Sequence, residues 1–94
     1  MDINCVILSE KAKKNLLKIP SYIVNKLMSW VEAINSDGLR EVRMSSGYHD
    51  EPLKGKRKGQ RSIRLSKSYR AIYIEKDNGK IEFLEVLEVN KHDY

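Results

Sequence analysis

Cysteine is almost absent from this sequence of 94 residues, and the single Cys5 excludes an internal disulfide bond. A small domain without disulfides is typical of a reducing compartment, so we expect a cytoplasmic protein. Cys5 lies in a short apolar run and is interpreted as a small buried hydrophobe. No stretch approaches the roughly 20 apolar residues that cross a bilayer, and residues 1–4 lack the basic start of a signal peptide. The sequence therefore predicts no membrane partner.

Histidine is also scarce, since His49 and His92 are the only two. Two histidines and one cysteine do not make up a zinc-ligand set, and neither common glycine-rich phosphate loop is present. We therefore expect a protein without a metal ion or a small-molecule cofactor. Residues 1–94 are expected to form a single domain, because a chain this short has room for one core only.

Acidic side chains are few in one third of the chain. Residues 39–70 contain ten Lys and Arg against three Asp and Glu, a net charge of +7, whereas the other residues carry eight basic and ten acidic side chains, a net charge of −2. A segment of this kind is typical of proteins that bind polyanions, because phosphate contacts supply affinity that does not depend on sequence. On charge alone, a solvated basic face without a ligand is the alternative.

The first half of the chain predicts one strand and two helices. Residues 3–8 are apolar and rich in β-branched side chains, as in a strand. Ser9 can cap a helix over residues 10–18, and Pro20 ends that helix and can open a second one. The second helix carries apolar residues at three- and four-residue spacing, namely Val24, Leu27, Met28, Val31 and Ile34.

Asp37-Gly38 is expected to end the second helix, and its Tyr22 and Trp30 are interpreted as packing residues. The rest of the chain predicts strands, although residues 39–44 are polar and show no pattern. The expected strands are residues 61–65, 69–75 and 81–89, with a further short one within 48–54, a charged loop at 54–59 and a hairpin turn at 77–79.

This order of elements predicts an α+β fold. An N-terminal strand and a two-helix hairpin would pack on one face of a mainly antiparallel sheet of four to five strands. The other face of the sheet would then be open to carry a site.

The polar residues of the strands suit RNA cleavage without a metal ion. In that reaction the 2′-OH of the substrate attacks the adjacent phosphate, so the enzyme needs a base, cations for the phosphorane and an acid for the leaving oxygen. Carboxylate or imidazole can act as the base, and arginine stabilises phosphate charge through paired hydrogen bonds. The candidates for these roles are Glu51, Lys54, Arg64, Arg70 and His92.

Four runs stand out in the second half of the chain: Asp50-Glu51-Pro52-Leu53-Lys54-Gly55, Gly59-Gln60-Arg61-Ser62-Ile63-Arg64-Leu65, Tyr69-Arg70-Ala71-Ile72-Tyr73 and Asn90-Lys91-His92-Asp93-Tyr94. Together they resemble the RelE/ParE superfamily of bacterial toxins, in particular its HigB and YoeB branches. The resemblance covers residues 48–94, and the first half matches in its strand-helix-helix layout.

The resemblance implies a RelE-like fold and the toxin of a type II toxin–antitoxin system. Such a toxin is a metal-free, ribosome-dependent endoribonuclease that cuts mRNA in the A site of the 30S subunit and so inhibits translation. Its partners would be mRNA, the ribosome and a cognate antitoxin protein.

The resemblance also implies roles for single residues. Glu51 matches a general base, Arg70 an arginine that stabilises the transition state, and His92 the C-terminal catalytic group, with Asp93 as the alternative for that position. His49 is open between a loop residue and an RNA contact. The expected RNA- and phosphate-binding residues are Lys54, Lys56, Arg57, Lys58, Arg61, Arg64 and Tyr94.

Two other functions are compatible with the sequence. One is a ParE-like gyrase inhibitor, which shares the fold but lacks the nuclease residues. The other is an RNA- or ribosome-binding module without catalysis. The combination of Glu51, Lys54, Arg64 and Arg70 favours the ribonuclease.

Overall fold

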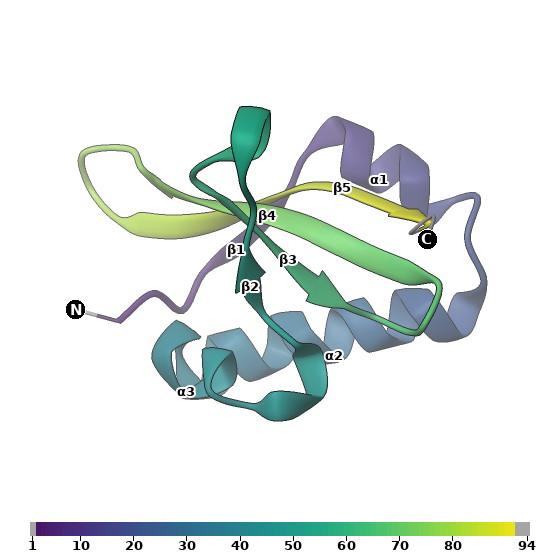
Figure 1. Cartoon of the computed structure of the whole chain (residues 1–94). Coiled ribbons are helices and arrows are strands. Elements are labelled where there is room, and N and C mark those ends of the chain that lie inside the picture. Colours follow the sequence, from purple (N-terminus) through teal and green to yellow (C-terminus); the bar gives the residue numbers. More distant parts are fainter. Residues whose placement is uncertain (1, 92–94) are drawn as a thin grey trace.

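The computed structural model describes residues 2–91. Its five strands form one sheet in the order β1-β5-β4-β3-β2 (Figure 1). β1 pairs with β5 in parallel, and every other neighbouring pair is antiparallel. The mainly antiparallel sheet agrees with the sequence prediction. The strands are β1 (Val6–Leu8), β2 (Glu51–Pro52), β3 (Gln60–Arg64), β4 (Tyr69–Asp77) and β5 (Glu82–Lys91).

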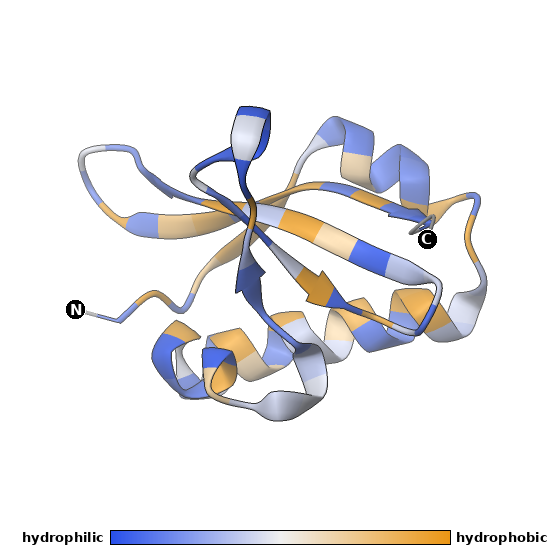
Figure 2. Ribbon diagram, viewed as in Figure 1, coloured by the Kyte–Doolittle hydropathy of each residue, from blue (hydrophilic) through white to orange (hydrophobic). Residues whose placement is uncertain are grey.

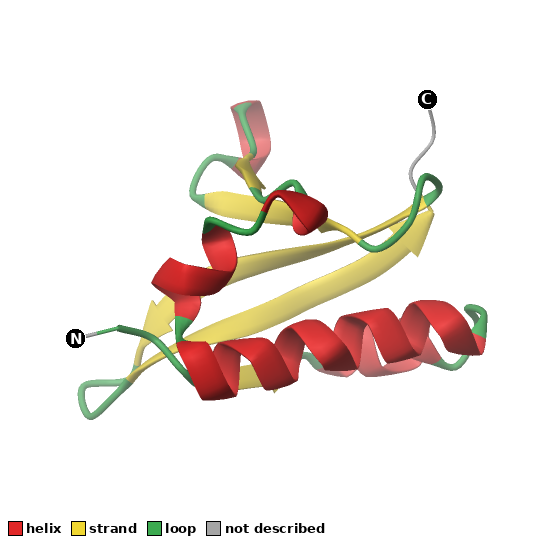
Figure 3. Ribbon diagram, turned by 90° about the horizontal axis from the view of Figure 1, so that it is seen from below, coloured by secondary structure: helices red, strands yellow, loops and turns green. Residues whose placement is uncertain are grey.

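Two of the three α-helices cover one face of the sheet. α2 (Ser21–Asp37) and α3 (Leu39–Arg43) lie on this side, which we call the core face, and α2 occupies the foreground of Figure 3. The opposite side of the sheet is called the outer face. None of the described helices is long and apolar enough to cross a membrane.

The remaining helix, α1 (Glu10–Leu16), lies along β5 beyond the end of β1. The Ser9 hydroxyl caps α1 by accepting the N–H of Ala12, as predicted. The backbone N–H of Ser9 donates to the carbonyl of Val86, and the Asn15 side-chain oxygen accepts the N–H of Val89. α1 therefore satisfies backbone groups on the edge of β5 that β1 is too short to reach.

A bulge in β5 explains why this strand has apolar residues at both odd and even positions. Ile72 of β4 pairs with Glu88 of β5, but the next residue, Tyr73, pairs with Val86, so Leu87 is the extra residue. Val86 and Val89 can then both face the core although they are three residues apart, whereas Glu88 points to the outer face.

The core lies between α2, α3 and the core face of the sheet. Trp30 packs against Tyr73 with ring centroids 5.2 Å apart. Figure 2 shows apolar residues alternating with polar ones along α2 and gathering in the middle of β4. The buried hydrophobic residues of this cluster are Ile3, Ala12, Ile23, Leu27, Trp30, Ile34, Leu39, Val42, Ile63, Leu65, Ala71, Tyr73, Leu84, Val86 and Val89.

The buried stripe of α2 is offset from the predicted one. Ile23 and Trp30 are fully buried, whereas 40% of Met28 is exposed. The interpretation of Tyr22 as a packing residue is wrong, since 64% of it is exposed. The stripe through Ile23 and Trp30 follows four- and three-residue steps, and Tyr22 lies about 100° away from it around the helix.

The segment between α2 and β3 differs most from the prediction. Residues 39–44 show no pattern in the sequence, but Leu39–Arg43 form the helix α3. Leu39 and Val42 are three residues apart, so a helix places both on its core side, where they are buried. A 3-10 helix, η1 (Ser46–Tyr48), follows, and the strand predicted within residues 48–54 is reduced to β2. Pro52 is tolerated in this edge strand because its position opposite Arg61 makes no ladder hydrogen bond, whereas the next residue, Leu53, donates its N–H to the carbonyl of Gln60.

Candidate functional site

Two rows of mostly polar side chains cross the outer face of the sheet, and Ile72 is their one apolar member. Residues that are directly opposite in neighbouring antiparallel strands point to the same face. One row is Arg64 of β3, Arg70 of β4 and Asn90 of β5. The parallel row runs from β2 to β5 through Glu51, Ser62, Ile72 and Glu88.

A cleft of about 190 Å³ lies between β2, the end of β3 and the start of β4, and residues of both rows line it. It contains the two arginines, one carboxylate, one imidazole and a lysine. Within residues 2–91, no three His, Cys, Asp or Glu side chains are grouped to hold a metal ion. The lining residues are His49, Glu51, Ser62, Ile63, Arg64, Ser66, Lys67, Tyr69 and Arg70.

Arg64 and Arg70 face each other across the β3–β4 pair. Like charges in directly opposite positions destabilise a sheet, and no ion pair within the described part of the chain involves Arg64, Arg70 or Lys67. The Arg70 Nε is buried and has no hydrogen-bond partner among the described residues. A phosphate group would relieve both the repulsion and the unsatisfied donor.

Glu51 and His49 line the opposite side of the cleft from the β2 edge. Glu51 is exposed and lies across from Ser62. His49 has a left-handed backbone conformation, with φ 47° and ψ 48°, which non-glycine residues seldom adopt. The structure thus brings Glu51, Arg64 and Arg70 together in one cleft with His49.

The charged loop after β2 contains a 3-10 helix, η2 (Gly55–Arg57). The lysines of this loop are exposed to solvent, whereas its arginine forms an ion pair. Lys54, Lys56 and Lys58 are exposed, and none of them lines the cleft. Arg57 instead turns back over the sheet, donating to Gln60 Oε1 at 2.8 Å and pairing with Glu88 at 2.5 Å.

Glu88 is the anchor of this contact on the outer face. Its second carboxylate oxygen pairs with Lys11 Nζ of α1 at 2.7 Å, and the side chain is only 8% exposed. The hydrogen bond from Lys11, with the charge of Arg57 in addition, lowers the pKa of Glu88 despite its burial. This pairing joins α1, η2 and β5.

Arg61 lies on the core face rather than in the cleft, because it is opposite Tyr73 in the sheet. Its Nε donates to Asp50 Oδ1 at 2.6 Å. Arg61 is therefore not part of the proposed site, and its role as a phosphate ligand stays a prediction. His92 and Tyr94, which the sequence also assigned to the site, lie outside the described residues.

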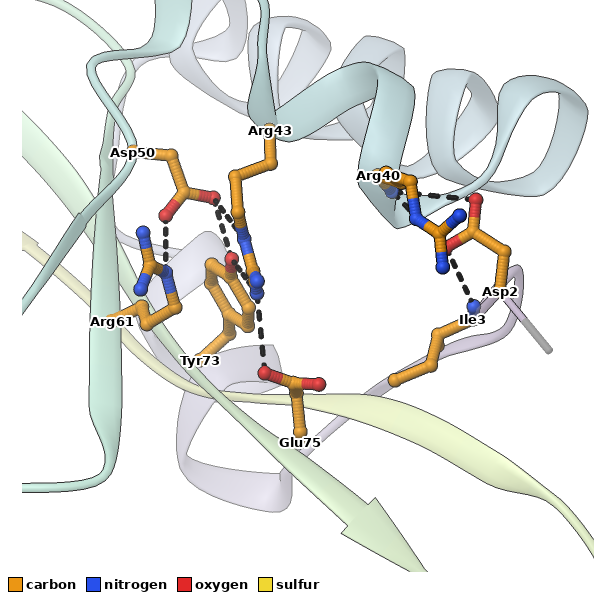
Figure 4. Close-up of polar contacts among 8 residues, drawn as sticks. All are labelled: Asp2, Ile3, Arg40, Arg43, Asp50, Arg61, Tyr73 and Glu75. Atoms are coloured by element: carbon orange, nitrogen blue, oxygen red, sulfur yellow. Dashed lines mark hydrogen bonds and ion pairs between the residues drawn. The ribbon is translucent and has the colours of Figure 1, made fainter.

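The sequence did not single out a cluster of polar residues around Asp50, which Figure 4 shows in close-up. The Tyr73 hydroxyl donates to Asp50 Oδ2, and Arg43 donates to both Tyr73 and Glu75 at 3.2 Å. Burial, followed by the hydrogen bond to Asp50, raises the pKa of the Tyr73 hydroxyl. The one available signal was the pair of acids at positions 50 and 51 within a strongly basic segment.

Comparison with known proteins identifies the relatives of the chain. A family model described as ParE toxin of type II toxin-antitoxin system, parDE, matches residues 6–91. A search of curated protein sequences found no match.

Several solved structures share the fold at low sequence identity. A YoeB/ParE toxin from Agrobacterium tumefaciens is 18% identical with a TM-score of 0.71, and 95% of this chain and 99% of that one are covered. YafQ from E. coli strain BL21(DE3) is 19% identical with a TM-score of 0.72, covering 93% and 91%. The toxin-antitoxin complex RelBE2 from Mycobacterium tuberculosis contains a chain that is 20% identical with a TM-score of 0.68, covering 98% and 100%. The predicted RelE-like α+β fold is therefore confirmed.

Proposed function

Since the chain belongs to the family of ParE toxins of type II toxin-antitoxin systems, we propose that it inhibits translation as an endoribonuclease that cuts mRNA on the ribosome. The observation that carries this proposal is the opposed pair Arg64 and Arg70 beside the Glu51 carboxylate in one cleft. A repelling pair with a buried, unsatisfied Nε is suited to an anion.

In this proposal the cleft would supply two of the three groups that the reaction needs. Glu51 would take the proton from the 2′-OH, whose oxygen attacks the adjacent phosphorus. Arg64 and Arg70 would stabilise the charge of the phosphorane. The bond to the 5′-oxygen then breaks, leaving a 2′,3′-cyclic phosphate and a 5′-hydroxyl once that oxygen is protonated. His92, with Asp93 as the alternative, stays our prediction for the proton donor.

The exposed lysines of the η2 loop are proposed to bind RNA and ribosomal phosphates. Lys54, Lys56 and Lys58 are exposed and make no ion pair within residues 2–91. Tyr94 stays a predicted stacking partner for a base. The partners proposed for the protein are therefore mRNA and the ribosome, in the cytoplasm.

A cognate antitoxin is the third proposed partner. One of the structural relatives was solved as a toxin-antitoxin complex, RelBE2. The net charge of +7 in residues 39–70 suits an acidic segment of such a partner, placed over the outer face.

The test is cleavage of a translated mRNA by the purified protein, with the 5′ ends mapped by primer extension. We expect new ends only when ribosomes are present, and loss of these ends with Arg64→Ala. Arg40→Ala is the matched control, because Arg40 is exposed on α3 and its loss removes the same charge. Equal cleavage by the wild type and Arg64→Ala would contradict the proposal.

Gyrase inhibition is the second candidate, and the description of the matching family as ParE favours it. A supercoiling assay with purified gyrase separates the two functions. Inhibition of supercoiling by a protein that leaves translated mRNA intact would establish this alternative.

A further inference from the structure

We propose that Asp50 is a positioning residue that aims Glu51 into the outer-face cleft. The inference rests on the ribonuclease function proposed above, in which Glu51 is the base. Asp50 itself does not line the cleft.

The carboxylate of Asp50 is held on the core side of the sheet from three directions. Its side chain is only 1% exposed. Arg61 of β3 donates to Oδ1 at 2.6 Å, Tyr73 of β4 donates to Oδ2, and Arg43 Nε of α3 lies 3.9 Å from Oδ2 (Figure 4). Buried carboxylates are stable only when they are paired in this way, so Asp50 is bound tightly at one position.

The segment around Glu51 has little else to hold it. β2 is two residues long and pairs only with β3, at Glu51–Ser62 and Pro52–Arg61. No ion pair or side-chain hydrogen bond of Glu51 occurs within residues 2–91. Apart from the backbone ladder to β3, the Asp50 carboxylate therefore supplies the side-chain contacts that fix this edge.

Strand geometry converts the tether into an orientation. Successive side chains of an extended chain point to opposite faces. With Asp50 fixed toward Arg61 and Tyr73 on the core face, Glu51 must point to the outer face, where Arg64 and Arg70 lie. The residue before Asp50, His49, has a left-handed backbone conformation and turns the chain from η1 into β2.

The network also links the cleft to α3. Arg43 bridges Tyr73 and Glu75 at 3.2 Å and completes the shell around Asp50. A shift of Glu51 by about 1 Å is enough to lower a reaction rate roughly 100-fold, because the base must meet the 2′-OH in a defined geometry.

Asp50→Asn tests the proposal, because it keeps the size of the side chain and removes its charge. We expect kcat for mRNA cleavage to fall by about 10- to 100-fold while KM changes by less than about threefold. Glu85→Gln is the matched control, since it removes a half-buried carboxylate whose ion pair, with Lys76 at 2.8 Å, lies outside this network, and we expect its kcat to stay near that of the wild type.

A double-mutant cycle with Glu51→Gln separates positioning from general stability. If Asp50 acts through Glu51, then Asp50→Asn added to Glu51→Gln should lower kcat by less than about twofold. Equal losses in both backgrounds would overturn the proposal. Should Asp50→Asn not fold, Tyr73→Phe removes only one donor to Asp50, and a smaller loss that also vanishes with Glu51→Gln is expected.

Amide hydrogen exchange gives a readout that does not need ribonuclease activity. The N–H of Leu53 donates to the carbonyl of Gln60 at 2.9 Å and reports on the β2 edge. We expect Asp50→Asn or Tyr73→Phe to speed exchange at Leu53 by more than about tenfold and at Val86, in the core, far less. Unchanged exchange at Leu53 in these variants would overturn the positioning role, whether or not the wild type cleaves RNA. If the variants lose protection at Leu53 but the wild type cleaves no RNA, only the proposed nuclease function is refuted.

Discussion

At the scale of single residues, the arginines of this protein differ in whether a carboxylate is within reach. Arg43, Arg57 and Arg61 each pair with a buried or half-buried acid. Arg64 and Arg70 have no such pair within residues 2–91 and are directly opposite each other. This uncompensated pair in a cleft supports the proposed binding of an RNA phosphate.

Arg70→Ala is predicted to remove toxicity without loss of stability. Losing one donor to a transition state lowers the rate by about 100- to 1000-fold, whereas the fold loses a repulsive pair and an unsatisfied Nε. Arg70→Lys should rescue poorly, because lysine cannot form paired hydrogen bonds. Growth arrest on induction and the unfolding free energy measure the two effects. A soluble Arg70→Ala protein with full toxicity would exclude Arg70 from the mechanism.

Glu88 is predicted to make stability depend on acid pH. Lys11 and Arg57 lower its pKa in the folded state, so its contribution is complete at neutral pH and is lost as the pH falls through the folded-state pKa. Glu88→Gln should lower the unfolding free energy by about 1 kcal/mol at pH 7, a value reduced because both cations are partly exposed.

The measurement is denaturant unfolding of both proteins at a series of pH values. The difference between wild type and Glu88→Gln should shrink as the pH falls below about 4.5. A difference that stays constant down to about pH 3 would show that the charge of Glu88 does not matter.

At the scale of elements, the junction of α2 and α3 connects the first residues of the chain to the segment that leads to β2. Gly38 has φ 85°, and its N–H donates to the carbonyl of Ile34 at 2.9 Å. The carboxylate of Asp2 lies against the Gly38 Cα and accepts the N–H groups of Ile3 and Arg40. Glycine is required here for its conformation and for this close approach.

Gly38→Ala is predicted to destabilise the protein by about 1–3 kcal/mol, because the positive φ is strained for alanine and the new Cβ would collide with the Asp2 carboxylate. Gly47→Ala is the control, since a Cβ at Gly47 meets nothing within 4 Å. Unfolding in urea compares the two. Similar midpoints for both variants would contradict the requirement at position 38.

At the scale of the whole molecule, the basic residues fall into two groups, one paired with buried carboxylates and one exposed to solvent. Some basic residues hold the fold together by pairing with Asp50 and Glu88. The others, which include the exposed lysines Lys54, Lys56 and Lys58 of the η2 loop, face solvent. Only this second group is available to attract a polyanion.

Replacing Lys56 and Lys58 by Gln is predicted to weaken binding to RNA and ribosomes rather than the cleavage step. The slope of log affinity against log salt should fall by roughly 0.7 for each phosphate that is no longer neutralised, and single-turnover cleavage at saturating substrate should change little. Lys14 and Lys18, exposed on and just after α1, provide a control that removes the same charge. Collapse of cleavage with unchanged binding would place the lysines in the chemistry instead.

The sequence by itself determined the elements whose signals are local. Ser9 specifies the start of α1 through a cap on the N–H of Ala12, and Asp37-Gly38 specifies the end of α2. The turn at 77–79 and the alternation of Ile63 and Leu65 predicted the β3–β4–β5 meander. Glu51, Arg64 and Arg70 were singled out by the resemblance of the second half of the chain to RelE/ParE toxins, and their roles stay predictions.

Only the tertiary structure decided which partner each charged residue meets. Alternation along β3 already places Arg61 and Arg64 on opposite faces, but the pairing of Arg61 with Asp50 and the cleft around Arg64 depend on the neighbouring strands. The extra residue Leu87 likewise turns Glu88 to the outer face, where it binds Arg57. Such pairs join residues that are far apart in the chain, and their partners depend on strand pairing and on a bulge. Periodicity along the chain gives neither the strand pairing nor the position of the bulge, because it reports on neighbours in sequence and not on neighbours in space.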